Sequence, residues 1–228
     1  MLVESNLKSR AMMRTRKGIK NKVYLIGKRL LDLIISFILL LFAMPALLFI
    51  SYWVYKREGA PILHKQQQMG KHHQPFIMWS FRTLTNTSQM IRSLPPYPVP
   101  ASWEEGVSDN FTIIPNQQQT ITQTGQTLRK YHIDKLPQLF NVLKGEMSLV
   151  GPEAETPEVT MYYNDDQMKR LAVRPGVIGY AQLKNKYNDQ HDEKIIHDLY
   201  YIKHGTFKLD LKIMMHTIKK QLPQRRRD

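Results

Sequence analysis

The sequence predicts an α+β, mostly helical protein that is held in a membrane by one N-terminal segment. Three observations carry this prediction. Residues 30–55 form an apolar run long enough to enter a bilayer. Apolar side chains recur at helical spacing in residues 136–143 and 195–222. Residues 76–81 have the composition of a short strand.

The net charge of +14 lies entirely at the two ends of the chain. Residues 1–29 contain nine Lys or Arg and one acidic residue, and residues 203–228 contain eight and two. Basic residues beside a membrane segment are attracted to anionic phospholipid, although an ordinary solvated flank also explains them. The sequence has no helix-turn-helix pattern, zinc-ligand spacing or aromatic RNA-binding motif, so we predict no nucleic-acid partner. The lack of cysteine excludes disulfides.

The chain divides into four predicted parts. Residues 1–22 form a basic flexible arm, residues 23–58 the membrane helix, residues 59–222 a separate domain, and residues 223–228 a basic tail. Within the domain, residues 84–126 are rich in proline and glutamine, which predicts a loop-rich excursion.

The course of the membrane segment depends on Pro45, near its middle. Proline has no amide hydrogen and its ring clashes with the carbonyl of Leu41, so the helix should kink here. Both flanks are basic, and a hairpin that enters and leaves on one side keeps both of them in the cytoplasm. Straight spans are commoner in general and tolerate proline, so these residues alone slightly favour a straight span.

The region with the most functional signals is residues 128–153. Leu136, Leu139, Phe140 and Leu143 predict a helix that ends at Gly145. Asp134 would then lie at the helix N-terminus, where an ordinary helix cap is the simpler interpretation.

Three further predictions concern the rest of the domain. Residues 158–171 are expected to form another helix, and the turn at Arg174 is a weak signal for phosphate binding. The apolar stripe of the last helix, which includes Leu211 and Met215, suits either a membrane surface or the protein core. The adjacent His72 and His73 lack metal-ligand spacing and are read as loop residues.

Five blocks of this sequence, in this order, resemble the bacterial sugar transferases. They are KRLLDL before the proline-broken apolar run, PFIMWSFRTL, LRKYHIDKLPQLFNVLKGEMSLVGPE, RPGVIGYAQL and LYYIKHGTFKLDLKIM. This family comprises the monotopic phosphoglycosyl transferases, which start polysaccharide and exopolysaccharide assembly. The resemblance covers roughly residues 23–220.

The resemblance implies a re-entrant membrane hairpin in the bacterial cytoplasmic membrane, with a small catalytic-type domain and amphipathic interfacial helices on the cytoplasmic face. The implied reaction moves a sugar 1-phosphate from a UDP-sugar to polyprenyl (undecaprenyl) phosphate with Mg²⁺, through an aspartyl phosphosugar on Asp134. Carried over by motif position, the phosphate-binding residues would be Arg82, Arg129, Arg174 and Gln182. The residues assigned to the membrane segment would be Lys28, Arg29, Asp32 and Pro45.

The sequence departs from the family pattern where charge matters most. Lys135 replaces the glutamate of the family's Asp-Glu pair, and Ser80, Glu153 and Gln68 stand where the family has cations. Two hypotheses follow, a divergent active transferase and a catalytically silent relative that binds membrane or a partner, and these residues slightly favour the second. No metal ligand is assigned, and the sequence leaves homo- or hetero-oligomers open.

Overall fold

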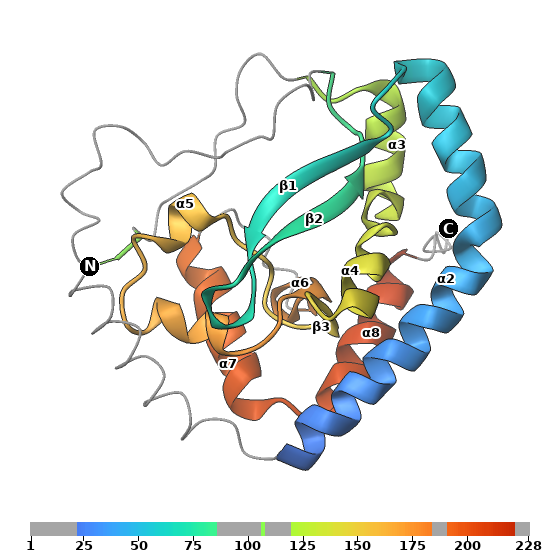
Figure 1. Ribbon diagram of the computed structural model, residues 1–228. Coiled ribbons are helices and arrows are strands. Elements are labelled where there is room, and N and C mark those ends of the chain that lie inside the picture. The colour runs from blue at the N-terminus through green and yellow to red at the C-terminus, as the bar shows by residue number, and fades with distance from the viewer. Residues whose placement is uncertain (1–21, 86–105, 108–119, 184–190, 222–228) are drawn as a thin grey trace, which may run out of the picture.

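The computed structural model describes residues 22–85, 106–107, 120–183 and 191–221. These residues form a mostly helical domain with two small sheets, packed against one long N-terminal helix (Figure 1). The α+β, mostly helical fold is therefore confirmed. The predicted basic arm, the basic tail and most of the excursion over residues 84–126 lie outside the described residues.

Helix α2 (Lys22–Glu58) is one continuous helix of 37 residues with Pro45 inside it. At about 1.5 Å per residue it is roughly 55 Å long, which exceeds the thickness of about 30 Å of a bilayer's hydrocarbon core. Figure 1 shows that its axis bends in the middle, with the convex side facing away from the domain. By length and composition, residues Tyr24–Glu58 could cross a membrane. The helix is bent but not interrupted, so the re-entrant course stays a prediction.

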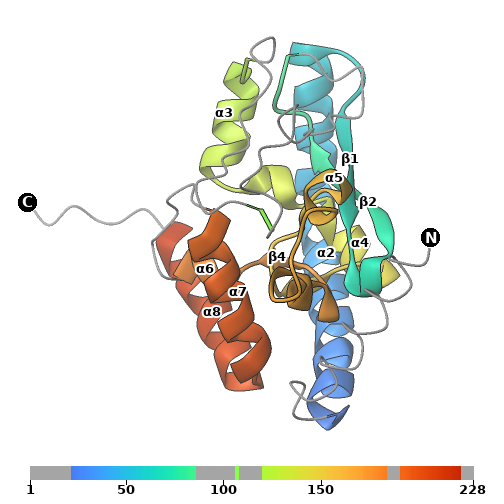
Figure 2. The same cartoon turned by 90° about the vertical axis from the view of Figure 1, so that its left-hand side faces the viewer.

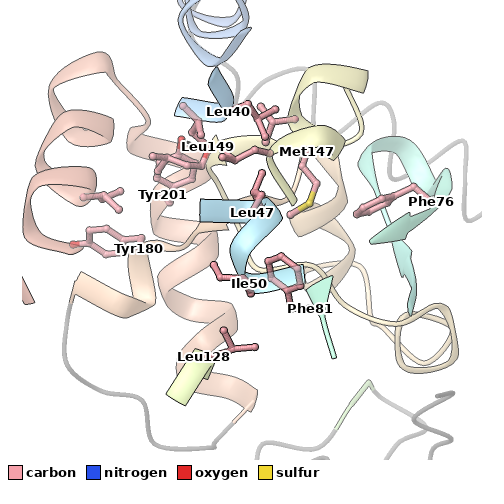
Figure 3. Packing of buried hydrophobic residues seen from close by; sticks show 14 of the residues in the cluster. Leu40, Leu47, Ile50, Phe76, Phe81, Leu128, Met147, Leu149, Tyr180 and Tyr201 are labelled. Carbon is pink, nitrogen blue, oxygen red and sulfur yellow. Dashed lines mark hydrogen bonds between the residues drawn. The ribbon is translucent and has the colours of Figure 1, made fainter. Parts of the chain in front are cut away.

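Helix α2 has two apolar faces. One face packs into the main core of the domain through Leu40, Leu47, Ile50 and Val54 (Figure 3). The opposite face leaves many large apolar side chains exposed, and Phe42 has 79% of its surface accessible. A soluble helix would not expose this much apolar surface, so the outer face is suited to lipid.

Two of the residues assigned to the membrane segment, Lys28 and Asp32, join α2 to the domain. Asp32 is buried and accepts hydrogen bonds from Ser148 Oγ at 2.7 Å and from the amide of Leu149 at 3.2 Å. Lys28 Nζ lies 3.1 Å from Asp210 on the last helix. The polar groups of Lys28 and Asp32 are therefore used within the protein, and the assignment of these residues to the membrane segment stays a prediction.

A β-hairpin follows α2. Strands β1 (Leu63–Met69) and β2 (Pro75–Phe81) pair antiparallel, and the short 3-10 turn η1 (Lys71–His73) connects them. The predicted strand over residues 76–81 is confirmed. Strand β1 escaped prediction because its sequence, LHKQQQM, has no apolar alternation.

Three helical pieces come next: α3 (Gln123–Lys130), the 3-10 turn η3 (Ile133–Lys135) and α4 (Gln138–Lys144). Helix α4 ends at Gly145, which has a left-handed φ of 89°. The predicted helix and its glycine stop are therefore confirmed.

Strands β3 (Ser148–Val150) and β4 (Gly176–Ile178) form a second, parallel sheet. The chain between them contains α5 (Pro157–Thr160) and the 3-10 helix η4 (Gln167–Ala172), so the single helix predicted over residues 158–171 was wrong. Asn164 interrupts it, because its Oδ1 accepts hydrogen bonds from the amides of Asp166 and Gln167 and starts a new turn. The sheet also requires Gly176, where a Cβ atom would lie 2.1 Å from the amide nitrogen of Gly151.

The domain ends with α6 (Tyr180–Leu183), α7 (His191–His204) and α8 (Phe207–Gln221). Figure 2 shows α7 and α8 side by side, on the side of the domain away from the β1–β2 hairpin. Helix α8 buries Ile213 in the core but exposes Leu211, Met215 and Ile218. The core interpretation is therefore confirmed for the face with Ile213, and the membrane-surface interpretation of the exposed face stays a prediction.

Candidate functional site

Asp134 lies in η3, between α3 and α4. The turn follows His132, whose φ of 53° is left-handed, and Ile133 and Leu136 anchor it by packing against the core. The N-cap position of α4 is Pro137, so Asp134 does not have the helix-capping role that was the simpler interpretation.

The carboxylate of Asp134 is partly buried among basic groups. Its Oδ1 is inaccessible to solvent and accepts no hydrogen bond within the described part of the chain. Burial raises the pKa of Asp134, while the positive charges of Lys135, Arg129 and His132 act in the opposite direction. A buried oxygen without a donor is costly, so a ligand that supplies a donor or a bond is expected to use it.

The two arginines predicted to bind phosphate ahead of Asp134 have different surroundings. Arg129 is close enough to Asp134 to act on its charge, and its Nε donates a hydrogen bond to Thr83 Oγ1 at 3.0 Å. Arg82 is buried and donates to four carbonyl oxygens, those of Glu58, Ala60, Leu84 and Thr85. Arg82 therefore holds the end of α2 to the hairpin, and its predicted role in phosphate binding stays a prediction.

A network of ion pairs is buried at Arg170, Asp198 and Glu155 and partly exposed at Lys194 and Glu153. Arg170 Nη2 is 2.6 Å from Asp198 Oδ2 and its Nη1 is 3.9 Å from Glu155 Oε2. Lys194 Nζ is 3.3 Å from both Glu155 and Glu153. Although burial alone would lower it, the two glutamates hold the pKa of Lys194 above its ordinary value.

Lys135 connects this network to Asp134. The charge of Lys194, followed by that of Lys135, lowers the pKa of Glu153 to about 2. Lys135 therefore acts on the charge of two carboxylates, Asp134 and Glu153. Positions 135 and 153, which the sequence presents as two separate departures, are thus linked through their charges in the structure.

Sequence reasoning missed Arg170, Lys194 and Asp198. A signal was present for Asp198, because it follows Ile195 by three residues on the apolar stripe of α7 and is buried there. A carboxylate on a buried helix face requires a cationic partner, which Arg170 provides.

The remaining predicted residues lie elsewhere. Arg174 donates from Nε to the carbonyl oxygen of Gly145 at 2.7 Å, at the opposite end of α4 from Asp134. Gln182 belongs to α6, and its side chain is outside the described part of the structure. The structure therefore brings together Asp134, Lys135 and Arg129, whereas Arg174 lies at the other end of α4.

The residues around Asp134 do not fit a protein-held Mg²⁺ ion. No group of three potential ligands from His, Cys, Asp and Glu occurs among the described residues. The neighbour of Asp134 is the cation Lys135, and the carboxylate of Glu153 is paired with Lys194. Mg²⁺ prefers carboxylate and water oxygens in octahedral geometry, and three basic side chains would repel it.

A comparison with protein families gives a match over most of the chain. The family described as "Bacterial sugar transferase" matches residues 23–224. The uncharacterized sugar transferase EpsL of Bacillus subtilis is 34% identical over 87% of this chain and 88% of its own length.

Two further relatives have names that state an activity. The undecaprenyl-phosphate galactose phosphotransferase of Salmonella typhimurium is 33% identical over 84% of this chain. The UDP-N-acetylgalactosamine-undecaprenyl-phosphate N-acetylgalactosaminephosphotransferase of Aeromonas hydrophila is 30% identical over 86% of it. The matched regions are 40% and 44% of those two proteins, so this chain corresponds to less than half of each. With the family matched over nearly the whole chain, this protein belongs to the bacterial sugar transferase family.

Proposed function

We propose that this protein transfers a sugar 1-phosphate from a UDP-sugar to polyprenyl phosphate at the cytoplasmic face of the bacterial membrane, with Asp134 as the nucleophile. The observation that carries the proposal is the surroundings of Asp134. One of its oxygens is buried without a donor, and three basic side chains surround the carboxylate. The relatives supply the reaction class, because their names specify undecaprenyl phosphate and a sugar phosphate.

The proposed reaction has two displacements at one phosphorus atom. In the first, a carboxylate oxygen of Asp134 bonds to the phosphorus that carries the sugar, and the bond from that phosphorus to UMP breaks. In the second, a phosphate oxygen of polyprenyl phosphate bonds to the same phosphorus, and the bond to Asp134 breaks. The products are UMP and polyprenyl diphosphate sugar, and the carboxylate is regenerated.

The chain's own cations have defined roles in this scheme. Arg129 and Lys135 flank Asp134 and would neutralise charge on the diphosphate as UMP leaves. Thr83 orients Arg129 through the hydrogen bond from its Nε. Because the residues do not fit a metal site, the scheme assigns no step to Mg²⁺.

A second candidate, a catalytically silent relative, is favoured by one observation. Glu153 presents a carboxylate close to Lys135, where the family places a cation, and this would repel a nucleotide diphosphate. In that case the domain would bind the membrane or a partner transferase without turnover.

Mass spectrometry of the intact protein tests both candidates. The protein is incubated in detergent with UDP-galactose, UDP-glucose or UDP-N-acetylgalactosamine and compared with Asp134→Asn and with Asp165→Asn, which changes an exposed aspartate. A sugar-phosphate adduct on the natural protein and Asp165→Asn, but not on Asp134→Asn, is the expected result. If the natural protein carries no adduct and releases no UMP, the silent alternative holds.

A further inference from the structure

A second basic site lies on the far side of α4 from Asp134. A cavity of about 680 Å³ is enclosed by the start of α2, the tip of the β1–β2 hairpin, the segment before β4 and the α7–α8 connection. Figure 1 shows these segments at the same lower side of the molecule. Its basic lining residues are Lys28, Arg29, Lys71, Arg174, Lys203 and His204.

This positive charge is not balanced within the cavity. Asp32 is the single carboxylate among the described lining residues, and Ser148 and Leu149 donate hydrogen bonds to it. Lys28 is paired with Asp210 outside the lining. Among the described residues, no acidic side chain forms an ion pair with Lys71 or Arg174, two further basic residues of the lining. The cavity therefore has an excess of positive charge.

Two guanidinium groups meet at the C-terminal end of α4. Arg29 Nη1 donates to the carbonyl oxygen of Val142 at 2.7 Å, and Arg174 Nε donates to that of Gly145, also at 2.7 Å. The negative end of the helix dipole favours one such cation. The terminal nitrogens of Arg174 make no hydrogen bond to any described residue, so they are available to an anion.

Lys71 is brought to the same place by a strained turn. The two residues after it, His72 and His73, have left-handed φ values of 57° and 61°, which are uncommon for residues other than glycine. Burial and the charge of Arg174 lower the pKa of Lys71. A half-buried lysine beside another cation, on a strained backbone, is the arrangement expected where an anion is bound.

The rest of the cavity wall is apolar. Leu25, Val173, Ile202 and Phe207 line it. Phe207 is also 43% exposed and begins the exposed apolar face of α8, which continues through Leu211 and Met215. The cavity therefore has a charged end and an apolar wall that extends to the protein surface. These features suit an amphiphilic ligand better than a free small anion.

We propose that this cavity binds the phosphate head of a membrane lipid that carries a phosphate monoester, with its chain along the exposed face of α8. A monoester bears a charge of about −1.5 to −2 at neutral pH, which the cluster of Arg29, Lys71 and Arg174 can neutralise. A phospholipid diester has one negative charge and a second bulky substituent. Both polyprenyl phosphate and phosphatidic acid have the required head group.

This lipid site is separate from Asp134, the proposed nucleophile of the transferase. The seven residues of α4, about 10 Å at 1.5 Å per residue, separate the basic cluster from η3. If the lipid is polyprenyl phosphate, which rests on the proposed function, the cavity holds the acceptor before it reaches Asp134.

Native mass spectrometry of the full-length protein from lipid nanodiscs tests the proposal. The nanodiscs contain phosphatidylcholine with undecaprenyl phosphate, phosphatidic acid or phosphatidylglycerol. Retention of a monoester lipid in preference to phosphatidylglycerol is expected, and Lys71→Gln or Arg174→Gln should each weaken it about tenfold or more. Lys65→Gln on the same hairpin, an exposed lysine, is the matched control and should retain the lipid.

The outcomes show which lipid is bound and whether its binding depends on catalysis. Retention of both monoester lipids supports a site that recognises the head group. Retention of undecaprenyl phosphate alone supports a site that also recognises the polyprenyl tail. Equal retention of phosphatidylglycerol, or unchanged retention in both glutamine variants, overturns the proposal. Lys71→Arg should restore binding if charge is what matters, which distinguishes lost binding from misfolding. Asp134→Asn should bind lipid normally even if no adduct forms, so this test does not depend on turnover.

Discussion

Arg170 binds Asp198 through two nitrogens that share one carboxylate oxygen. Nε lies 2.9 Å and Nη2 2.6 Å from Asp198 Oδ2, and both side chains are buried. Arg170 Nη2 also donates to the carbonyl oxygen of Glu153 at 3.1 Å. This pair therefore fixes the segment that carries Glu153, and through it the charge facing Lys135.

Removal of Arg170 should strongly destabilise the domain. Arg170→Met leaves the carboxylate of Asp198 buried without its partner, and breaking a buried pair in this way costs about 3–5 kcal/mol. Urea unfolding in detergent, followed by tryptophan fluorescence, measures the loss. Lys169→Met is the matched control, because Lys169 is an exposed neighbour paired with the exposed Asp166, and should change stability by less than about 1 kcal/mol. A similar small loss for Arg170→Met would show that the network is not structurally important.

The activity of the natural protein should fall in acid at a higher pH than an ordinary aspartate would allow. The proposed nucleophile must be ionised, and burial raises the pKa of Asp134 above 3.8. Activity is therefore full above this raised pKa and is lost as the pH falls through it. The pH profile of kcat/KM for UMP release reports this pKa for the free enzyme. An acid limb below 3.8 would contradict the surroundings described for Asp134.

Substitution of Lys135 by glutamate should lower activity, although glutamate is the family residue. The new carboxylate would stand between Asp134 and Glu153, and its negative charge would raise the pKa of both. We expect slower adduct formation on Asp134 and an acid limb shifted to higher pH by about one unit. Lys135→Arg, which keeps the charge, should leave the limb nearly in place. Faster turnover by Lys135→Glu would contradict the proposal that the positive charge of Lys135 keeps Asp134 ionised.

Both ends of α2 should face the cytoplasm. The helix contains Pro45, bends in its middle and has basic residues at both ends. The chain has no native cysteine, so single cysteines can be placed at Lys22 and Gly59 without background. In intact cells both should be protected from a membrane-impermeant maleimide, and both should react after permeabilisation. Labelling of only one in intact cells would establish a straight span, which Pro45→Leu is expected to favour.

The sequence predicted those helices and strands that are determined by residues close together in the chain. The helix over residues 136–143, its stop at Gly145 and the strand over residues 76–81 follow from spacing, a glycine and β-forming residues. Strand β1 could not be found in this way, because its glutamines become a strand only by pairing with β2.

The candidate site shows the same division. A family motif identified Asp134, but the effect of Lys135 on the charge of Glu153 joins residues 18 positions apart and depends on the tertiary fold. The pair of Arg170 and Asp198 links η4 to α7 and has no local sequence pattern. For Arg82, its position in a motif does not reveal that it donates hydrogen bonds to four backbone carbonyls, and its role in phosphate binding stays a prediction.

The burial of one face of α2 has a consequence for how the protein is made. Leu40, Leu47, Ile50 and Val54 form part of the main core, yet they are synthesised before every other residue of that core. The N-terminal segment leaves the ribosome first, so α2 can be in the bilayer when the remaining chain emerges. The later segments would then assemble on a template that is already at the membrane surface. Removal of residues 22–58 to obtain a soluble fragment would therefore take away one wall of the core.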